Sequence, residues 1–530
     1  MIANEIAGKL KANEIFSEVT AVAPGFINIC LTDTFLSKLL NDMYSDERLN
    51  LPLLNPKTIV VDFGGPNVAK PLHVGHLRSA IIGDSLCRLA RFLGYNVIGD
   101  VHLGDWGLQM GMVIAEIKRT QPNLPYFQPD FCGEYPNVSP VTVDELNVLY
   151  PTASARAKVD EDFAKEAAQA TVELQDRRAG YMALWRHIWN VSVEDLKKNY
   201  DILGVHFDKW YGESDADEYI PQVMNRLKER NLLRESDGAQ VVDVARDDDK
   251  EPMPPMLIVK SNGADIYGTT DLGTLIQRMQ DWNPDEIWYV VDNRQALHFK
   301  QVFRCATLSG ILSDQTVCSH IGFGTMNGKD GKPYKTRDGG VMRLSDMIET
   351  VTSNAYSKAN ESDVIDEEDK KTAIAQLVGV AAMKIGDMVN HRTKDYIFDM
   401  ERFLASEGKT GPYLQYTAVR INSVLKKAID INANFGEIIT PATSTERELM
   451  LSLISVSEAL LRALSEKAPN VICEKLFEIT GIFNRFYFEN KILTCQDEKQ
   501  RSSWLTLLNA TYRMIQILLS LLGVGIPEQM

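Results

Sequence analysis

Short apolar runs alternate with amphipathic stretches between about Thr58 and Arg343. The apolar runs are rich in β-branched residues and end at turn residues, which predicts strands buried on both faces. A long amphipathic stretch follows the first run and carries apolar residues at helical spacing up to Gly94, a typical helix stop. This alternation predicts an α/β fold built on a doubly wound parallel, Rossmann-like sheet. The expected strands are 58–63, 96–103, 286–292 and 316–324.

The alternation is interrupted once and then ends. Residues of about 121–235 open with a proline-rich loop and continue as charged helices, which predicts a mostly helical insertion. Strand signals end near Ser345, and helical patterns continue to the C-terminus. We therefore expect a short N-terminal region, an α/β domain that carries the insertion, a helical connecting segment and an all-α C-terminal domain. Their predicted bounds are 1–50, 55–345, 346–410 and 411–530.

The composition, with 45% hydrophobic and 24% charged residues, is that of an ordinary folded protein. No apolar run reaches the roughly 18 residues that a membrane helix needs, and the seven cysteines form no C-x-x-C pair. These features predict a reduced, cytoplasmic protein with no membrane partner, zinc site or disulfide framework. The net charge of −16 argues against a nucleic-acid partner, but a local basic surface on an acidic chain leaves that question open.

The sequence KPLHVGH, residues 70–76, lies where the first predicted strand gives way to a helix. A helix N-terminus at the carboxyl end of a parallel strand offers free N–H groups to anions. There, His73 and His76 would donate to phosphate oxygens, and Gly75 would let the backbone approach a nucleotide closely. For the four letters H-V-G-H alone, two surface or capping histidines are an equally good interpretation.

A second basic stretch, GKDGKPYKTRDGG at 328–340, follows the last predicted strand. Its glycines predict a mobile loop, and Lys332, Lys335 and Arg337 predict a phosphate clamp that closes over a nucleotide. A solvated surface loop is the commoner explanation of such a composition. Its pairing with H-x-G-H at the front of the same sheet favours the nucleotide site.

Together these two motifs resemble those of the class I aminoacyl-tRNA synthetases. Colinear stretches along nearly the whole chain are similar to the arginyl-tRNA synthetase family. The resemblance implies that ATP and L-arginine form an arginyl-adenylate with release of pyrophosphate, and that the arginyl group then passes to the terminal adenosine of its tRNA. The stretches are PNVAKPLHVGHLRSAIIGD (66–84), HLGDWGLQMG (102–111), WYGES (210–214), IYGTTD (266–271), RQALHFKQ (294–301) and GPYLQYTAVR (411–420).

The resemblance implies roles for residues around the phosphates of ATP. His73 and His76 would stabilise charge on the α-phosphate as the arginine carboxylate attacks it. Lys335 would neutralise the departing pyrophosphate, Gly75 would lie beside the nucleotide, and Mg²⁺ is assumed to arrive with ATP. Neutralisation of the pyrophosphate would be shared among Lys70, Lys332 and Lys335. The glycines expected beside the adenine are Gly322 and Gly324.

Recognition of arginine requires acidic residues, because a guanidinium prefers planar carboxylates in bidentate geometry. By resemblance, Glu213 and Asp271 would hold it and would reject lysine, whose point charge cannot satisfy the fork. The alternative for Asp271 is an acidic residue in the first turn of a helix capped by Thr269 or Thr270. The further residues that the resemblance places around the substrate are Asn67 at the α-amino group, Tyr267 and Gln295.

Some residues in the similar stretches keep two interpretations. Asp105, Trp106 and Gln109 would either shape the second half of the sheet or act directly on substrate. His298 would either line the pocket or lie satisfied in the core.

The C-terminal helical domain resembles the anticodon-binding domain of the family, although the letters D-A-L-R are absent. Arg420, Lys426 and Lys427 would contact tRNA phosphates. The first fifty or so residues resemble only the tail of the family's N-terminal domain, which touches the tRNA elbow. We therefore expect a shortened form or an incomplete start.

Three functions are compatible with these observations. The first is a working, monomeric arginine–tRNA ligase. The second is a different H-x-G-H enzyme, either a nucleotidylyltransferase or another class I synthetase. A small nucleotidylyltransferase would need neither an anticodon-type domain nor a guanidinium pocket. The third is a non-catalytic tRNA-binding homologue, which would be expected to lose some of the motif residues that this chain retains.

Overall fold

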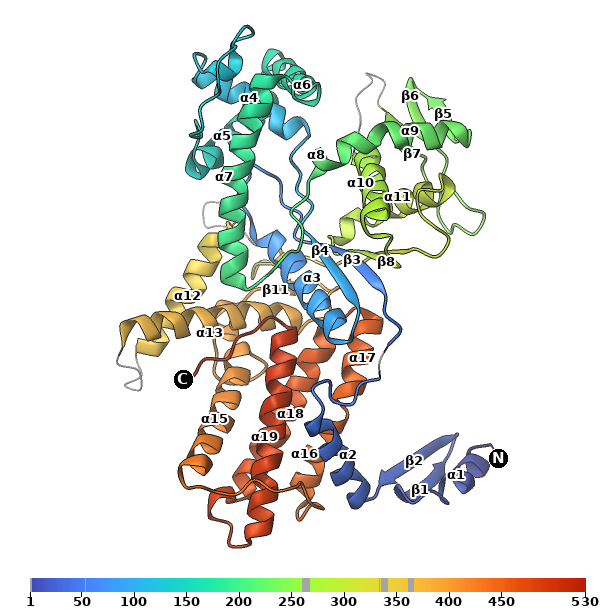
Figure 1. Ribbon diagram of the computed structural model, residues 1–530, viewed down its shortest axis with the longest axis vertical. Coiled ribbons are helices and arrows are strands. Elements are labelled where there is room, and N and C mark those ends of the chain that lie inside the picture. The colour runs from blue at the N-terminus through green and yellow to red at the C-terminus, as the bar shows by residue number, and fades with distance from the viewer. Residues whose placement is uncertain (1, 53, 260–266, 333, 335–341, 361–366) are drawn as a thin grey trace. The chain divides into compact units, whose positions relative to one another are not determined.

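The computed structural model of the chain describes residues 2–52, 54–259, 267–332, 334, 342–360 and 367–530. The chain forms two compact units, and each is described by itself (Figure 1). The α/β unit comprises Asn55–Thr350 and Arg392–Asp399. The helical unit comprises Met1–Leu54, Val351–His391 and Met400–Met530.

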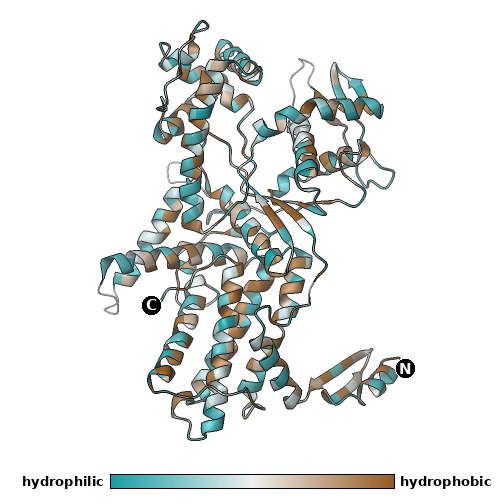
Figure 2. Cartoon of the chain, viewed as in Figure 1, coloured by the Kyte–Doolittle hydropathy of each residue, from teal (hydrophilic) through white to brown (hydrophobic). Residues whose placement is uncertain are grey.

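A parallel sheet forms the centre of the α/β unit. Its strands follow the order β4-β3-β8-β9, and every neighbouring pair is parallel. The four predicted strand positions and the parallel arrangement are thus confirmed. Figure 2 shows brown, hydrophobic stretches within the strands at the centre of this unit. The strands are β3 (Thr58–Asp62), β4 (Asn96–Asp100), β8 (Glu286–Tyr289) and β9 (Val317–His320).

Helices cover both faces of this sheet, as a doubly wound fold requires. Successive side chains of a strand point to opposite faces, so Val60 and Asp62 share one face and Val61 lies on the other. Val60 packs in a core with α10 (Tyr267–Trp282) and α11 (Ala296–Leu308). On the opposite face, α3 (Val74–Phe92) approaches closely enough that a Cβ on Gly83 would lie 2.2 Å from the Phe63 ring.

The prediction of strands buried on both faces is wrong for β9. Val317 at its start is 55% exposed. The reason is position, because β9 is the last strand in the order and pairs only with β8 among the described residues. An apolar run alone does not distinguish a central strand from such an edge strand.

Between β4 and β8, helices pack beside one another and a small antiparallel sheet of order β5-β6-β7 follows (Figure 1). The sequence did not predict this sheet, because each of its strands has only four residues. The elements are α4 (Leu108–Thr120), η1 (Pro125–Phe127), α5 (Val143–Ala157), α6 (Glu161–Gln175), α7 (Ala179–Leu203), α8 (Glu213–Ala216), η2 (Asp217–Tyr219), α9 (Ile220–Glu229), β5 (Leu233–Ser236), β6 (Ala239–Val242) and β7 (Met256–Val259).

The α/β unit also contains a short strand pair beyond the predicted strand region. There, β10 (Met326–Asn327) pairs in parallel with β11 (Tyr396–Ile397). A strand after residue 345 was not expected, and two residues are too few to show a periodic pattern. The α/β unit also contains η3 (Asn293–Gln295), and α12 (Leu344–Asn360) begins in the α/β unit and continues into the helical unit from Val351.

The helical unit begins with a helix and an antiparallel hairpin and continues as packed helices. Its α15 starts at Gly411, where the Thr410 hydroxyl accepts the N–H of Tyr413 and caps the helix. Within the described ranges, none of the chain's helices combines the length and hydrophobicity that a membrane crossing needs. The elements are α1 (Ile2–Leu10), β1 (Phe16–Val22), β2 (Phe26–Leu31), α2 (Asp33–Ser45), α13 (Glu368–Met388), α14 (Met400–Phe403), α15 (Gly411–Asp430), α16 (Ser444–Ile454), α17 (Val456–Glu466), α18 (Asn470–Glu489), η4 (Ile492–Thr494) and α19 (Glu498–Leu521).

Candidate active site

The two histidines of H-V-G-H cap the N-terminus of α3. Nδ1 of His73 accepts the N–H of Gly75 at 3.1 Å, and Nδ1 of His76 accepts the N–H of His73 at 3.1 Å. Their rings lie 3.9 Å apart between centroids. The capping interpretation and the anion-site interpretation therefore do not exclude each other, because capping uses only one nitrogen of each ring.

Both histidines are uncharged near neutral pH. Burial lowers the pKa of His73 to about 4, assisted by the positive charges of Lys70 and Arg294. Burial, His73 and Lys70 lower the pKa of His76 to about 3. Because each Nδ1 accepts a backbone N–H, the proton of each neutral ring lies on Nε2. Each ring therefore keeps one N–H donor for a phosphate oxygen.

Gly75 is required by the fold of this turn itself. A Cβ at this position would lie 2.8 Å from Cε1 of His73, so any larger residue would displace that ring. Lys70 lies on the loop before the helix, with its Nζ 5.7 Å from the centre of the Tyr150 ring of α5. Its charge reaches both histidines, as their lowered pKa values record.

The second basic stretch is described only in part. Lys332 is exposed, and its backbone closes a turn with Gly328. Lys335 and Arg337 lie outside the described residues. The segment that follows returns to the first motif, because Val74 donates its N–H to the carbonyl of Met342 at 3.1 Å. Backbone hydrogen bonding thus places the residues that follow the second basic stretch beside the start of the first motif.

The two glycines expected beside the adenine contact protein groups. A Cβ on Gly322 would lie 2.1 Å from Oδ1 of Asn293, and one on Gly324 would lie 2.5 Å from Oδ1 of Asp395. The carbonyl of Gly324 accepts Nη1 of Arg78 at 2.7 Å. Close approach by neighbouring side chains is therefore one reason for glycine at both positions.

Glu213 begins α8 and is half-buried, within electrostatic reach of other acids. Burial, together with the negative charges of Asp105 and Asp271, raises its pKa to about 8. Asp105 fixes this turn, because its carboxylate accepts the N–H of Ser214 at 3.0 Å and its hydroxyl at 2.7 Å. Burial raises the pKa of Asp105 to about 6. A cation entering here would meet the carboxylates of Glu213 and Asp105, for neither of which the described residues show an ion pair.

Asp271 lies on α10, and the helix-cap interpretation of it is wrong. The helix begins at Tyr267, so Thr269 and Thr270 are helical residues, and the Thr269 hydroxyl donates to the carbonyl of Ile258 at 2.5 Å. Oδ2 of Asp271 lies 2.5 Å from Nε2 of His298 on α11. His298 is therefore a neighbour of the predicted pocket acid. Of the other residues predicted around the substrate, Gln295 is exposed, and the side chain of Tyr267 lies outside the described residues.

Gln109 holds Asn67 in place. Its Nε2 donates to Oδ1 of Asn67 at 3.2 Å and to the carbonyl of Gly104 at 2.6 Å. A Cβ on Gly104 would lie 2.1 Å from the same Asn67 oxygen, so this contact requires glycine. The similar stretch 102–111 therefore has a structural explanation that the sequence left open. It supports Asn67 through Gln109 and supports the Glu213 turn through Asp105.

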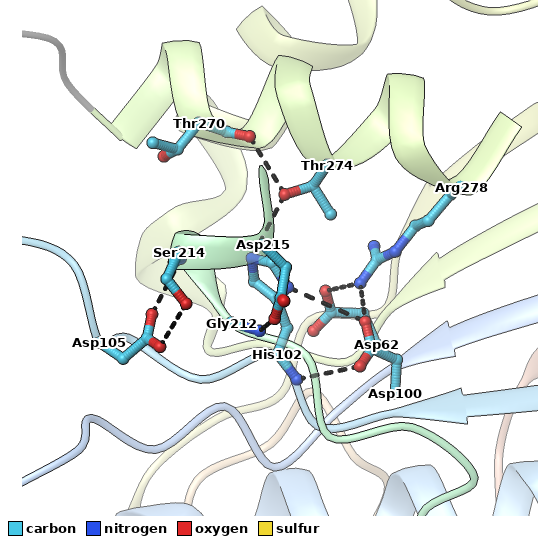
Figure 3. A network of polar contacts seen from close by, with 10 residues as sticks. All are labelled: Asp62, Asp100, His102, Asp105, Gly212, Ser214, Asp215, Thr270, Thr274 and Arg278. Atoms are coloured by element: carbon cyan, nitrogen blue, oxygen red, sulfur yellow. Dashed lines mark hydrogen bonds and ion pairs between the residues drawn. The ribbon is translucent and has the colours of Figure 1, made fainter. Parts of the chain in front are cut away.

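The sequence missed a buried charge network beside the pocket. Nη2 of Arg278 on α10 lies 2.7 Å from Oδ2 of Asp62 and 2.7 Å from Oδ2 of Asp100, at the carboxyl ends of β3 and β4 (Figure 3). His102 lies beside Asp100, at 3.8 Å, and contacts Thr274. The two carboxylates and His102 offer metal ligands within 4.8 Å of one another. Because Arg278 already contacts both carboxylates, this cluster does not fit a metal ion.

The residues predicted to contact tRNA lie on α15 of the helical unit. Arg420 donates to Oδ1 of Asn484 at 3.2 Å and lies over the Tyr416 ring. Lys426 and Lys427 are exposed. Arg420 also lines a groove of about 630 Å³ with residues of α18 and η4, including Phe488, which is 90% exposed.

Comparisons with known proteins agree with this geometry. Residues 38–400 match the family model described as tRNA synthetases class I (R), catalytic domain. Residues 414–530 match the DALR anticodon binding domain despite the missing letters, and residues 1–31 match the arginyl tRNA synthetase N terminal domain. The model of the catalytic domain thus covers more than half of the chain.

Full-length relatives and solved structures carry the same family name. Arginine–tRNA ligases of Alkaliphilus oremlandii and Agathobacter rectalis are 50% and 48% identical to all of this chain, which covers 90% and 91% of their lengths. The arginyl-tRNA synthetase structure from Plasmodium falciparum is 25% identical with a TM-score of 0.79, covering 99% of this chain and 89% of that one. The Thermus thermophilus structure, at 22% identity, TM-score 0.80 and coverage of 100% and 92%, shows the same fold. The chain belongs to the arginyl-tRNA synthetase family.

Proposed function

We propose that the protein is an arginine–tRNA ligase, which activates L-arginine with ATP and transfers it to tRNA. The observation that carries this proposal is the acidic pair of Glu213 and Asp271. The charge of Asp271 raises the pKa of Glu213, and no arginine of the described residues pairs with either carboxylate. A guanidinium that binds between them would favour the ionised form of Glu213, whose pKa is raised to about 8 without it. The residues that this proposal assigns to arginine are Asn67, Glu213, Tyr267, Asp271 and Gln295.

The first chemical step is attack on ATP by the arginine carboxylate. One carboxylate oxygen forms a bond to the α-phosphorus while the bond to the pyrophosphate oxygen breaks, and pyrophosphate leaves with the electron pair. The Nε2–H groups of His73 and His76 donate to oxygens of the α-phosphate, where negative charge gathers in the transition state. Being neutral, the two rings supply hydrogen bonds and orientation. The positive charges that stabilise pyrophosphate come from Lys70, Lys332 and Lys335.

Magnesium enters this proposal only as a companion of ATP. The acidic cluster of Asp62, Asp100 and His102 is closed by Arg278 and does not fit the ion. Mg²⁺ is held by phosphate oxygens and waters in many nucleotide enzymes. We therefore assign no protein residue to it and no chemical step to a metal ion.

The second step transfers the arginyl group to a terminal hydroxyl of tRNA, with release of AMP. Phosphate contacts from Arg420, Lys426 and Lys427 on α15 would hold the tRNA, with 411–530 as the anticodon-binding domain and 1–50 at the tRNA elbow. The proposed catalytic domain is 55–345, with its insertion at about 121–235 and a helical connection at 346–410. We further propose a monomer in the cytoplasm, where the substrate tRNA is and where the seven free cysteines stay reduced.

Arginine-dependent exchange of pyrophosphate into ATP, measured with and without tRNA that accepts arginine, tests the function. We expect exchange with arginine and none with lysine, because lysine leaves the acidic pair incompletely paired. No exchange under either condition, while tRNA still binds, would favour the non-catalytic homologue, a function that the retained His73, His76 and pocket acids argue against.

His76→Ala tests the phosphate role separately. It should slow adenylate formation by about 100-fold, the cost of losing one oxyanion donor, and leave the dissociation constant for arginine unchanged. Unchanged turnover in this variant would contradict the assignment of Nε2 of His76 to the α-phosphate.

A further inference from the structure

His298 occupies an unusual place for a residue outside the proposed reaction. Its Nε2 lies 2.5 Å from Oδ2 of Asp271, one of the two acids proposed to receive the guanidinium. Both side chains are partly exposed, at 30% for His298 and 22% for Asp271. The contact is therefore a pair at the edge of the pocket, within reach of water and of a substrate.

We propose that His298 is a positioning residue for arginine recognition: it orients Asp271 through Oδ2 and releases a proton to solvent when the guanidinium binds. This inference rests on the proposed function. When the proton is released, the Nδ1–H bond of the His298 imidazolium breaks, the electron pair of that bond stays on nitrogen and the proton passes to water. The neutral ring keeps Nε2–H as a donor to Oδ2, and Oδ1 remains for the substrate.

The charge balance of the pair supports this step. Burial lowers the pKa of His298, but the hydrogen bond and negative charge of Asp271 outweigh burial and raise the pKa above its ordinary value. At pH 6.5 the free protein therefore carries His298 at least half protonated. An arriving guanidinium shares the charge of Asp271 and repels the imidazolium, so it lowers that pKa and expels the proton.

The basic groups on the elements next to the pair of Asp271 and His298 have acidic partners of their own. Asp271 acts on Glu213 and on Tyr289, and Glu213 in turn feels Asp105. On η3 and α11, Arg294 pairs with Asp292, while Lys300 and Arg304 pair with Asp249. The ring of His320 on β9 stacks on Phe299 and accepts or donates to the carbonyl of Val291.

Two groups are therefore linked to arginine binding, and both release protons. Glu213, with a pKa of about 8, loses one when it pairs with the guanidinium, and His298 loses another. Affinity for arginine should rise with pH, by up to about tenfold per pH unit for each linked proton. His298→Gln keeps an Nε2 donor and removes the titration, so it separates the two contributions.

Calorimetry of arginine binding in two buffers of different ionisation enthalpy, at pH 6.5, counts the released protons. We expect His298→Gln to release fewer protons than the unchanged protein, by half a proton or more, and Glu213→Gln to keep the share of His298. His187→Gln, the same substitution at a half-buried histidine that contacts the carbonyl of Pro136, should release the unchanged number. At saturating arginine, exchange by the control variant His187→Gln should match the unchanged protein.

The possible outcomes are distinct. Equal proton counts for the unchanged protein and a folded His298→Gln would overturn the role of His298 and leave the function standing. If His298→Gln does not fold, His298→Asn gives the same reading. Absence of arginine binding by the unchanged protein at any pH between 6.5 and 8.5 would overturn the proposed function, and this inference with it.

Discussion

Two acidic pairs of the α/β unit each involve helix α10, and among the described residues only one of them is paired with a guanidinium. Asp62 and Asp100 close around Arg278, whose side chain is 1% exposed. Glu213 and Asp271 have no arginine between them among the described residues. Asp271 and Arg278 are seven residues apart on α10, so they face the same side of that helix. Figure 3 shows the Arg278 end of this face.

The difference separates a structural charge site from a binding site. Burial raises the pKa of Asp62 although the charge of Arg278 opposes the rise. Burial and the charges of Asp105 and Asp271 raise the pKa of Glu213 to about 8, against only a backbone hydrogen bond from Trp106. The first pair is completed when the chain folds. The second keeps an electrostatic cost in the free protein, which a substrate guanidinium would relieve if it binds there as we propose.

Removing the internal guanidinium should have the largest effect. Arg278→Met leaves Asp62 and Asp100 buried without a cation, so we expect the free energy of unfolding to fall by about 3–5 kcal/mol. The loss should shrink as the pH falls toward 5, because Asp62, whose pKa is raised by burial and no longer held down by Arg278, binds a proton in the folded state. Urea unfolding at pH 7.5 and pH 5.5 measures both effects.

A matched control is Arg234→Met in the small antiparallel sheet. Arg234 makes a two-pronged pair with Asp243, at 2.7 and 2.8 Å, but both side chains are about half exposed. This variant should unfold almost as the unchanged protein does, at either pH. Equal losses for the two variants would remove the distinction between the buried network and an ordinary surface pair.

The sequence predicted the sheet well because its strands are local apolar runs. It also predicted the stop of α3 at Gly94, which adopts a φ of 95°. It did not predict the Arg278 network, because Asp62, Asp100 and Arg278 lie far apart in the chain and each resembles an ordinary strand-end or helix residue. Only the parallel pairing of β3 with β4 brings the two carboxylates together.

The candidate site shows the same limit. Similarity of motifs identified Glu213 and Asp271, but the partner of each required tertiary structure. The sequence alone leaves two roles open for Asp105 and two for His298. The structure shows that Asp105 accepts hydrogen bonds from Ser214 and that His298 contacts Asp271. The part of the second basic stretch that carries Lys335 lies outside the described residues, so its role stays a prediction.

Opening the substrate pair should have the next largest effect, on binding rather than on folding. Asp271→Ala removes one of the two carboxylates that face the guanidinium, so arginine affinity should weaken by about 3 kcal/mol, or roughly 150-fold. Unfolding should change little, since Asp271 is partly exposed. Calorimetric titration with arginine measures the loss, and Asp271→Asn, which keeps the shape without the charge, should fall between. Unchanged affinity in Asp271→Ala would assign the residue to its pair with His298 alone.

The smallest effect should come from the support of Asn67, which lies outside both pairs. Gln109→Leu removes the donor to Oδ1 of Asn67 and to the carbonyl of Gly104. The side-chain amide of Asn67 then loses the hydrogen bond that fixes its orientation. Loss of these bonds corresponds to about 1.4 kcal/mol, or roughly a tenfold rise in KM for arginine with little change in kcat.

A control for that variant is Gln175→Leu. Gln175 donates to the carbonyl of Trp106 at 3.1 Å, in the same stretch, without touching Asn67. If both variants raise KM equally, the stretch acts as general packing around the pocket. If only Gln109→Leu does so, the result supports two separate contacts with the substrate. The acidic pair would then supply the charge that selects a guanidinium, and Asn67 would set where the α-carboxylate of arginine meets ATP.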